Sequence, residues 1–253
     1  MDDQSQTSTS VTRSKRSVWG HEANGLWRIP GRLLGVPAVL TILSVVAVGL
    51  RFPYAENIAP PPPKSGASEF PRAFWLYAAA SALVGFGFAD FPLIAYHYAN
   101  AATVSPVMIP VFYAIAMGAA GAGSLVFGRW FDRRGLRILI PGIAIGIAVA
   151  PLVFLGGFWA ALTGTLLWGV SLGVHDAIMN AAVARMVPER SRARAYGVFT
   201  AVYGIAWFAG SAVLGLLYDF SFVALTGVAV IAELAAFIPL LMAIRAVSSS
   251  SGR

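Results

Sequence analysis

Seven long apolar stretches, separated by short polar connections, constrain the fold of this chain more than any other feature. Apolar residues make up 58% of the 253 residues and charged residues only 11%, the reverse of a soluble domain. A helix that crosses a hydrocarbon core of roughly 30 Å needs about 20 apolar residues. The chain is therefore predicted to be an all-α, polytopic membrane protein in a lipid bilayer. The stretches are 33–50, which is the shortest and weakest, 73–96, 107–127, 138–155, 158–184, 195–217 and 220–244.

Beyond residue 50, lysine and arginine residues are confined to alternate connections between these stretches and to the tail after the last one. Four connections, 51–72, 129–137, 185–194 and 245–253, contain thirteen of them, whereas 98–105, 156–157 and 218–219 contain none. Basic loops stay on the cytoplasmic side, so the carboxyl terminus is predicted to be cytoplasmic and the protein to lie in the cell membrane. The placement of the basic residues thus sets orientation, and the net charge of +7 does not indicate a nucleic-acid partner.

Composition also divides the chain into five parts. Residues 1–30 are predicted to be a disordered polar tail, 31–50 a weak transmembrane helix, and 51–72 a cytoplasmic linker that Pro60–Pro63 keeps extended. Residues 73–245 form a predicted bundle of six spans, and 246–253 a cytoplasmic tail. In the bundle the basic connection follows the second span of the first triplet but the first span of the second. The two three-helix repeats are therefore expected to be inverted.

One basic turn carries a specific motif. Gly128, Asp132, Arg133, Gly135 and Arg137 have the spacing Gly-x-x-x-Asp-Arg-x-Gly-x-Arg between two apolar stretches. This turn resembles a cytoplasmic loop of major facilitator superfamily transporters. In that pattern the first glycine closes one spanning helix and the second allows the turn into the next.

The resemblance covers about residues 27–245 and is similar to the carboxyl-terminal half of the family. It implies that 33–50 matches the sixth of twelve helices, 51–72 the central loop, and the later spans helices seven to twelve. The implied function is transport of a small-molecule substrate by a half-length or truncated carrier. Such a carrier needs a second six-helix unit or a homodimer, and the gating role of the loop motif needs that opposite half; the alternative for this loop is simple cytoplasmic anchoring.

The first stretch conflicts with the charge rule. If the bundle begins inside the cell at residue 73, then 33–50 must run inward, which places Arg13, Lys15, Arg16, Arg28 and Arg32 outside. Either 33–50 does not span the membrane, or further upstream helices impose its orientation.

Ionisable residues within spans are costly in lipid and mark candidate transport sites. Asp90 precedes Phe91-Pro92, and Pro92 removes a backbone hydrogen bond and frees a carbonyl nearby. A carboxylate at such a break is a candidate proton or cation site, or else a buried polar pin. His97, seven residues later on the same face, is a candidate to share a water file with Asp90, or an interfacial histidine.

A second polar group lies late in 158–184. His175, Asp176 and Asn180 are candidates for substrate contact or gating, with Asp176 and Asn180 on one face. Gly169 and Gly173 form a small-xxx-small pair that predicts close approach of another helix. In the family, the spans that match 73–96 and 158–184 border the central cavity, although Asp90 and Asp176 are expected at different depths.

Two further carboxylates have other expected roles. Asp132 is predicted to be ionised and hydrogen-bonded within its arginine-rich turn. Glu233 lies in the last span, which in the family is on the outside of the bundle, so it should pair with a neighbour, stay protonated or mark an oligomer contact.

Competing functions stay open at this level. The chain is either a transporter half or an inactive fragment or structural membrane subunit. An intramembrane enzyme fits less well, because Asp90 lacks the Gly-x-Gly-Asp pattern of membrane aspartyl proteases. No catalytic residue, cofactor or metal site is predicted. Two carboxylates without mid-span lysine or arginine favour proton-coupled export of neutral or cationic organic solutes, but they fix neither substrate, direction nor coupling ion.

Overall fold

The computed structural model describes residues 39–40, 43–44, 46–47, 51 and 70–250. The chain divides into two units, residues 1–62 and 63–253. In the first unit the described residues are all helical. The predicted tail 1–30, most of the helix 31–50 and most of the linker 51–72 lie outside the described residues, so those predictions are not tested.

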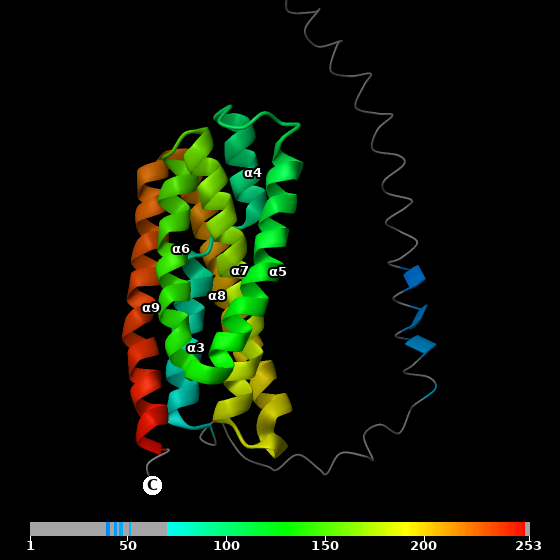
Figure 1. Cartoon of the computed structure of the whole chain (residues 1–253), viewed down its shortest axis with the longest axis vertical. Coiled ribbons are helices and arrows are strands. Elements are labelled where there is room, and N and C mark those ends of the chain that lie inside the picture. The colour runs from blue at the N-terminus through cyan, green and yellow to red at the C-terminus, as the bar shows by residue number, and fades with distance from the viewer. Residues whose placement is uncertain (1–38, 41–42, 45, 48–50, 52–69, 251–253) are drawn as a thin grey trace, which may run out of the picture. The chain divides into compact units, whose positions relative to one another are not determined.

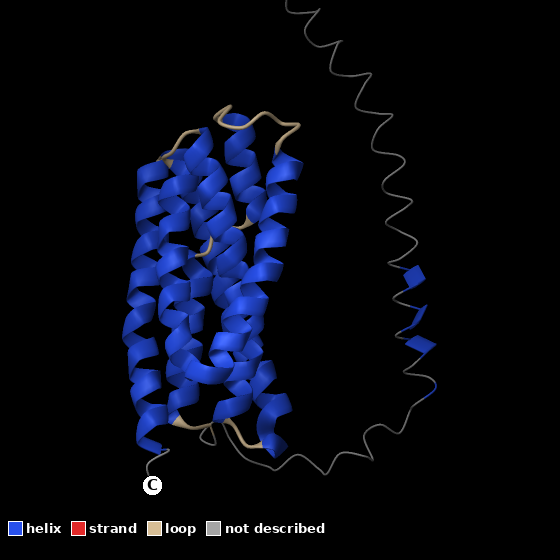
Figure 2. Ribbon diagram, in the orientation of Figure 1, coloured by secondary structure: helices blue, strands red, loops and turns tan. Residues whose placement is uncertain are grey.

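The second unit is a bundle of long helices (Figure 1) without a strand in its described residues (Figure 2). Five runs are long and apolar enough to cross a membrane, and one of them, Ile109–Phe154, contains two helices joined by a short 3₁₀ helix. The helices are α3 (Arg72–Gly87), α4 (Phe91–Asn100), α5 (Ile109–Arg134), α6 (Leu139–Phe154), α7 (Phe158–Met186), α8 (Arg192–Phe220) and α9 (Phe222–Ser250), with short 3₁₀ helices η3 (Gly135–Ile138) and η4 (Glu189–Ser191). The predicted all-α membrane fold is confirmed.

The packing of the helices supports two inverted repeats. The first repeat comprises α3–α4, α5 and α6, and the second comprises α7, α8 and α9. The main contacts are α3 with α8 and α9, α7 with α5 and α6, and α6 with α9. Exchanging α3 for α7, α5 for α8 and α6 for α9 reproduces this set of contacts. Such an exchange is what an inverted repeat requires.

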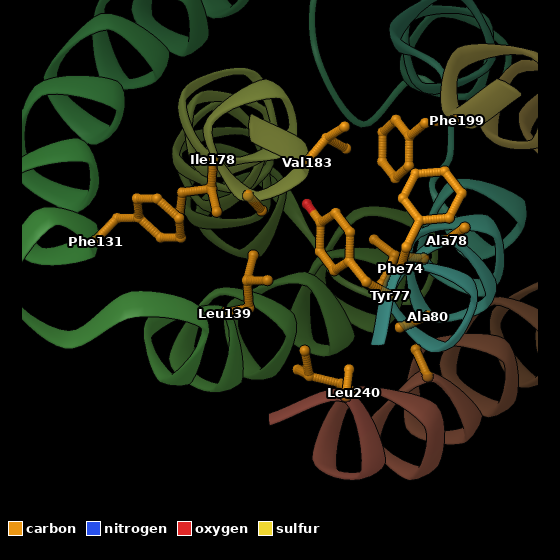
Figure 3. Close-up of a cluster of buried hydrophobic side chains, with 14 of the residues drawn as sticks. Phe74, Tyr77, Ala78, Ala80, Phe131, Leu139, Ile178, Val183, Phe199 and Leu240 are labelled. Atoms are coloured by element: carbon orange, nitrogen blue, oxygen red, sulfur yellow. The ribbon is translucent and has the colours of Figure 1, made fainter. Parts of the chain in front are cut away.

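Two clusters of buried apolar side chains fill the bundle, one towards each end. The first gathers around Tyr77 and Phe74 of α3, Ile178 of α7 and Leu240 of α9 (Figure 3). The second gathers around Phe88, Phe112, Trp168 and Leu214. The broken span α3–α4 contributes to both clusters, so it crosses the whole core.

Small residues bring α5 and α7 together as predicted. A Cβ atom added at Gly169 or Gly173 would collide with the α5 backbone, at Ala116 and Ala120 respectively. The hydroxyl of Ser124 on α5 donates to the Gly173 carbonyl at 2.9 Å. Lipid provides no hydrophobic force between helices, so this close backbone contact is a main source of their association.

Several predicted boundaries were wrong. Gly128 does not close a helix, because α5 continues to Arg134; instead it lies in α5 with Ala177 of α7 as its nearest neighbour. Gly135 ends α5 with φ 59°, a conformation that favours glycine, as the motif predicted. The predicted tail 246–253 is helical as far as Ser250, since α9 extends the last span.

Candidate transport site

A break in the first span of the bundle presents the carboxylate of Asp90. Helix α3 ends at Gly87 and α4 begins at Phe91, with Pro92 in its first turn. The amide of Leu93 donates to the Asp90 carbonyl at 3.1 Å. The Ala89 carbonyl therefore does not accept the hydrogen bond that a continuous helix would give it. Nε1 of Trp168 on α7 donates to that Ala89 carbonyl at 2.8 Å. This carbonyl, freed at the break, is thus satisfied by an indole from the second repeat.

The Asp90 side chain reaches across to α8 and makes no cap to its own helix. Nε1 of Trp207 donates to Oδ1 at 2.6 Å, and the Ser211 hydroxyl donates to Oδ2 at 2.5 Å. Trp207 and Ser211 are four residues apart, so they present both donors from one face of α8. Hydrogen bonds to an ionised acceptor are about twice as strong as neutral ones. The half-buried Asp90 is therefore held firmly at the break.

Asp176, the second predicted acid, is exposed on α7. Asp90 and Asp176 make no hydrogen bond with each other, in line with the expected difference in depth.

Aromatic side chains form a continuous row past Asp90. Tyr203 lies edge-on to Trp207, with ring centroids 5.5 Å apart, and Trp207 lies edge-on to Phe88 at 6.1 Å. Phe88 stacks on Trp168 at 5.7 Å, and Tyr203 stacks on Phe199 at 6.4 Å. Sequence reasoning missed Tyr203, Trp207 and Ser211. Their spacing of four residues within an apolar span was the available signal.

His97 and Asp90 have separate partners on α8. His97 is 3% exposed, and its Nδ1 lies 3.3 Å from the Tyr218 hydroxyl, among the rings of Phe154 and Phe222. Tyr218 is eleven residues beyond Trp207, or about 16 Å along α8. No direct contact joins His97 to Asp90, so the shared water file stays a prediction.

His175 lies on a different face of α7 from Asp176. It is 5% exposed, packs edge-on against Phe88 at 5.3 Å, and has no hydrogen-bond partner at Nδ1. It borders a small cavity of about 20 Å³ together with Tyr77 and Ser81 of α3. The structure does not describe the side chain of Asn180, so its predicted patch with Asp176 is not tested.

An ion pair joins the loop motif to α7. Asp132 does not bond within its own turn as predicted; its Oδ1 pairs with the Arg185 guanidinium at 3.0 Å. The same guanidinium donates to the Phe131 carbonyl at 3.1 Å and lies 4.3 Å above the Phe131 ring. The long Arg185 side chain reaches the end of α5 because α5 and α7 stay in contact as far as this end of the two helices. Arg133 and Arg137 are exposed.

Glu233 does not face lipid. It is 4% exposed and points towards Gly146 of α6 and Gly87 of α3, because α9 packs against both helices. Among the described residues, its Oε2 has no hydrogen-bond partner, so the predicted pairing with a neighbour is not seen there.

The helical bundle with inverted packing and a carboxylate at a broken span is that of a multi-pass membrane protein. The chain belongs to the Major Facilitator Superfamily, whose family model matches residues 17–211 and 78–252. Uncharacterized proteins of Mycobacterium tuberculosis and Mycobacterium bovis are 35% identical over 175 residues, which is 69% of this chain and 42% of theirs. A probable sugar efflux transporter of Pasteurella multocida is 22% identical over 197 residues, 74% of this chain and 48% of its own. The chain thus spans less than half the length of these relatives.

Proposed function

We propose that this chain is one six-helix half of a secondary transporter that carries a small solute across the cell membrane. The carboxyl terminus of the chain then lies in the cytoplasm. The observation that carries the proposal is Asp90, a carboxylate fixed at a break within a span by two donors from α8. Alternating access in such folds is rocking of one bundle against another around a site near mid-membrane.

The relatives' length supports a second six-helix unit, because they are more than twice as long as the segment matched here. Helix α8 is also sparsely buried over its length, and it exposes Ile205, Phe208, Leu216 and Phe220. Either another bundle or lipid must cover these side chains. We propose that the second unit, or a second copy of this chain, covers the side of α8 next to Asp90.

The chemistry near Asp90 suits two solute classes. Carboxylates and a tyrosine hydroxyl bind sugar hydroxyls, and aromatic rings pack against the apolar faces of sugars; the Pasteurella relative supports this class. The same carboxylates and rings also bind organic cations, through charge and cation–π contact. We propose the neutral, sugar-like class, because the Pasteurella relative supports it and each Asp90 oxygen already accepts a hydrogen bond from Trp207 or Ser211.

The test uses the full chain in proteoliposomes, with a pH gradient and two probes, a radiolabelled hexose and tetraphenylphosphonium. We expect hexose uptake that falls at least tenfold in Asp90→Asn. Glu189→Gln is the control, since Glu189 is an exposed carboxylate in η4 outside the span.

Uptake of tetraphenylphosphonium alone would replace the sugar class by the cation class. Uptake of neither probe, in vesicles that contain a folded and self-associated chain, would favour the structural-subunit alternative.

A further inference from the structure

Glu233 is a buried acid with no role in the site around Asp90. It lies in the middle of α9 and is 4% exposed, and its Oε2 has no hydrogen-bond partner. A buried carboxylate that keeps its charge needs a paired cation or several donors. The described residues provide neither here, so another species must neutralise this group.

The surroundings of Glu233 are almost entirely apolar. It borders a cavity of about 10 Å³ whose other lining residues are Gly87, Phe88, Ala89, Gly146, Ile147, Val149, Ala150, Ala229 and Val230. None of these carries an ionisable side chain. Helix α6 has no ionisable residue along its length, and no residue of α8 borders the cavity.

Other ionisable groups on the neighbouring helices lie elsewhere. Asp90 is near in sequence to Ala89, but its two oxygens are bonded to α8. Arg72 and Tyr77 lie ten or more residues before Gly87 on α3, and Arg245 lies twelve residues beyond Glu233 on α9. His175 borders the separate cavity near Leu240, about two turns further along α9.

The side chain of Glu233 packs closely against two glycines. A Cβ atom at Gly146 would collide with Oε2, and one at Gly87 would lie 3.1 Å from Cγ of Glu233 and 2.7 Å from the Ala229 carbonyl oxygen. Gly87 is the last residue of α3, immediately before the break. Glu233 thus packs behind the break, whereas Asp90 bonds to α8 from the break itself.

We propose that Glu233 is a proton-binding site, and that the bound proton keeps α9 closed against the broken span. A proton suits this site better than a metal ion, because an alkali or alkaline-earth cation needs several oxygen ligands and the lining side chains other than Glu233 contain no oxygen. Loss of the proton leaves a charge that must be hydrated, which separates α9 from Gly87 and Gly146. This inference concerns proton binding by the chain itself and does not require transport.

The first test is infrared difference spectroscopy of the full chain in lipid nanodiscs, with Glu233→Gln as the isosteric neutral variant. At pH 7 we expect the wild type to show the C=O band of a protonated carboxylic acid, shifted in ²H₂O, and Glu233→Gln to lack it. Glu189→Gln, which removes an exposed carboxylate, should keep it. Absence of a band that depends on Glu233 would show an ionised group and overturn the proposal.

Titration of the wild type needs no variant and separates a proton from a metal ion. Raising the pH at constant sodium should remove the band, whereas adding sodium chloride at pH 7 should leave it unchanged. Loss of the band on adding sodium at constant pH would make this a cation site and refute the proton assignment.

Amide hydrogen exchange tests the link to the break. Above the pH at which the band disappears, we expect residues 84–90 to exchange at least tenfold faster in wild type than in Glu233→Gln at the same pH. Below that pH the two should agree. Equal exchange at both pH values would show that the proton does not hold the break closed.

Discussion

The close contact between α5 and α7 predicts opposite effects for two alanine substitutions. In Gly173→Ala the new Cβ would collide with the Ala120 carbonyl and lie 2.9 Å from the Ser124 amide nitrogen. These are backbone atoms and cannot turn aside as a flexible side chain would, so the two helices must move apart. Such overpacking typically costs about 1–3 kcal/mol.

Separation of the helices also weakens the hydrogen bond from Ser124 to the Gly173 carbonyl. Hydrogen bonds between membrane helices contribute about 0.6 kcal/mol on average. We therefore expect Gly173→Ala to lower the free energy of unfolding by roughly 2–4 kcal/mol. For a chain of this size the midpoint of thermal unfolding should then fall by roughly 4–16 °C.

Gly121 is the matched control on the partner helix. It lies within α5, and an added Cβ would meet nothing within 4 Å. Gly121→Ala should therefore raise stability by about 0.5–1 kcal/mol, because alanine restricts the unfolded chain more than glycine does. The assay is thermal unfolding in detergent, followed by the helical circular dichroism signal. Equal stability of the two variants would refute the packing argument.

Two further substitutions test single contacts. Trp168→Phe keeps a ring beside Phe88 but leaves the buried Ala89 carbonyl without its donor, so we expect a loss of about 1–3 kcal/mol in the same unfolding assay, and an unchanged midpoint would contradict this role. Asp132→Asn removes an ion pair whose side chains are 47% and 74% exposed, so it should cost less than about 1 kcal/mol and less still in high salt; a larger loss would mean that the Arg185 pair is a principal link between α5 and α7.

The spans of the bundle were predictable because a lipid bilayer allows few backbone structures to cross it. Twenty-residue apolar runs and the Gly135 turn are local signals, and both were confirmed in the bundle. The helix ends were less predictable, since α5 continues through Gly128 to Arg134 and α9 continues to Ser250. Polar residues extend a helix beyond the apolar run at no great cost where they reach water.

Side-chain partners were not predictable, since they depend on which helices meet. Sequence placed Asp90 at a break but could not supply Trp207 and Ser211, which come from a helix more than a hundred residues away. The surroundings of Glu233 were not predictable for the same reason. The family pattern assigned Glu233 to an outer helix but did not indicate which face of that helix is buried.

The inverted repeats give the two candidate acids corresponding places. Asp90 is eighteen residues after the start of α3, and Asp176 is eighteen residues after the start of α7. Helices α5 and α8 correspond in the same way, and counting from their first residues pairs Trp207 with Ser124 and Ser211 with Gly128. The counterparts of the two residues that hold Asp90 therefore provide no donor to Asp176 within the described part of the chain.

This difference separates the roles of the two acids under the proposed function. The Ser124 hydroxyl donates its hydrogen bond to the Gly173 carbonyl, and Gly128 has no side-chain donor. Asp176 is consequently exposed, whereas Asp90 has a donor on each oxygen. Asp90 is thus already bonded to α8, whereas no hydrogen bond to Asp176 is seen among the described residues. We infer that Asp90 fixes the shape of the site and that Asp176 makes the exchangeable contact with the solute.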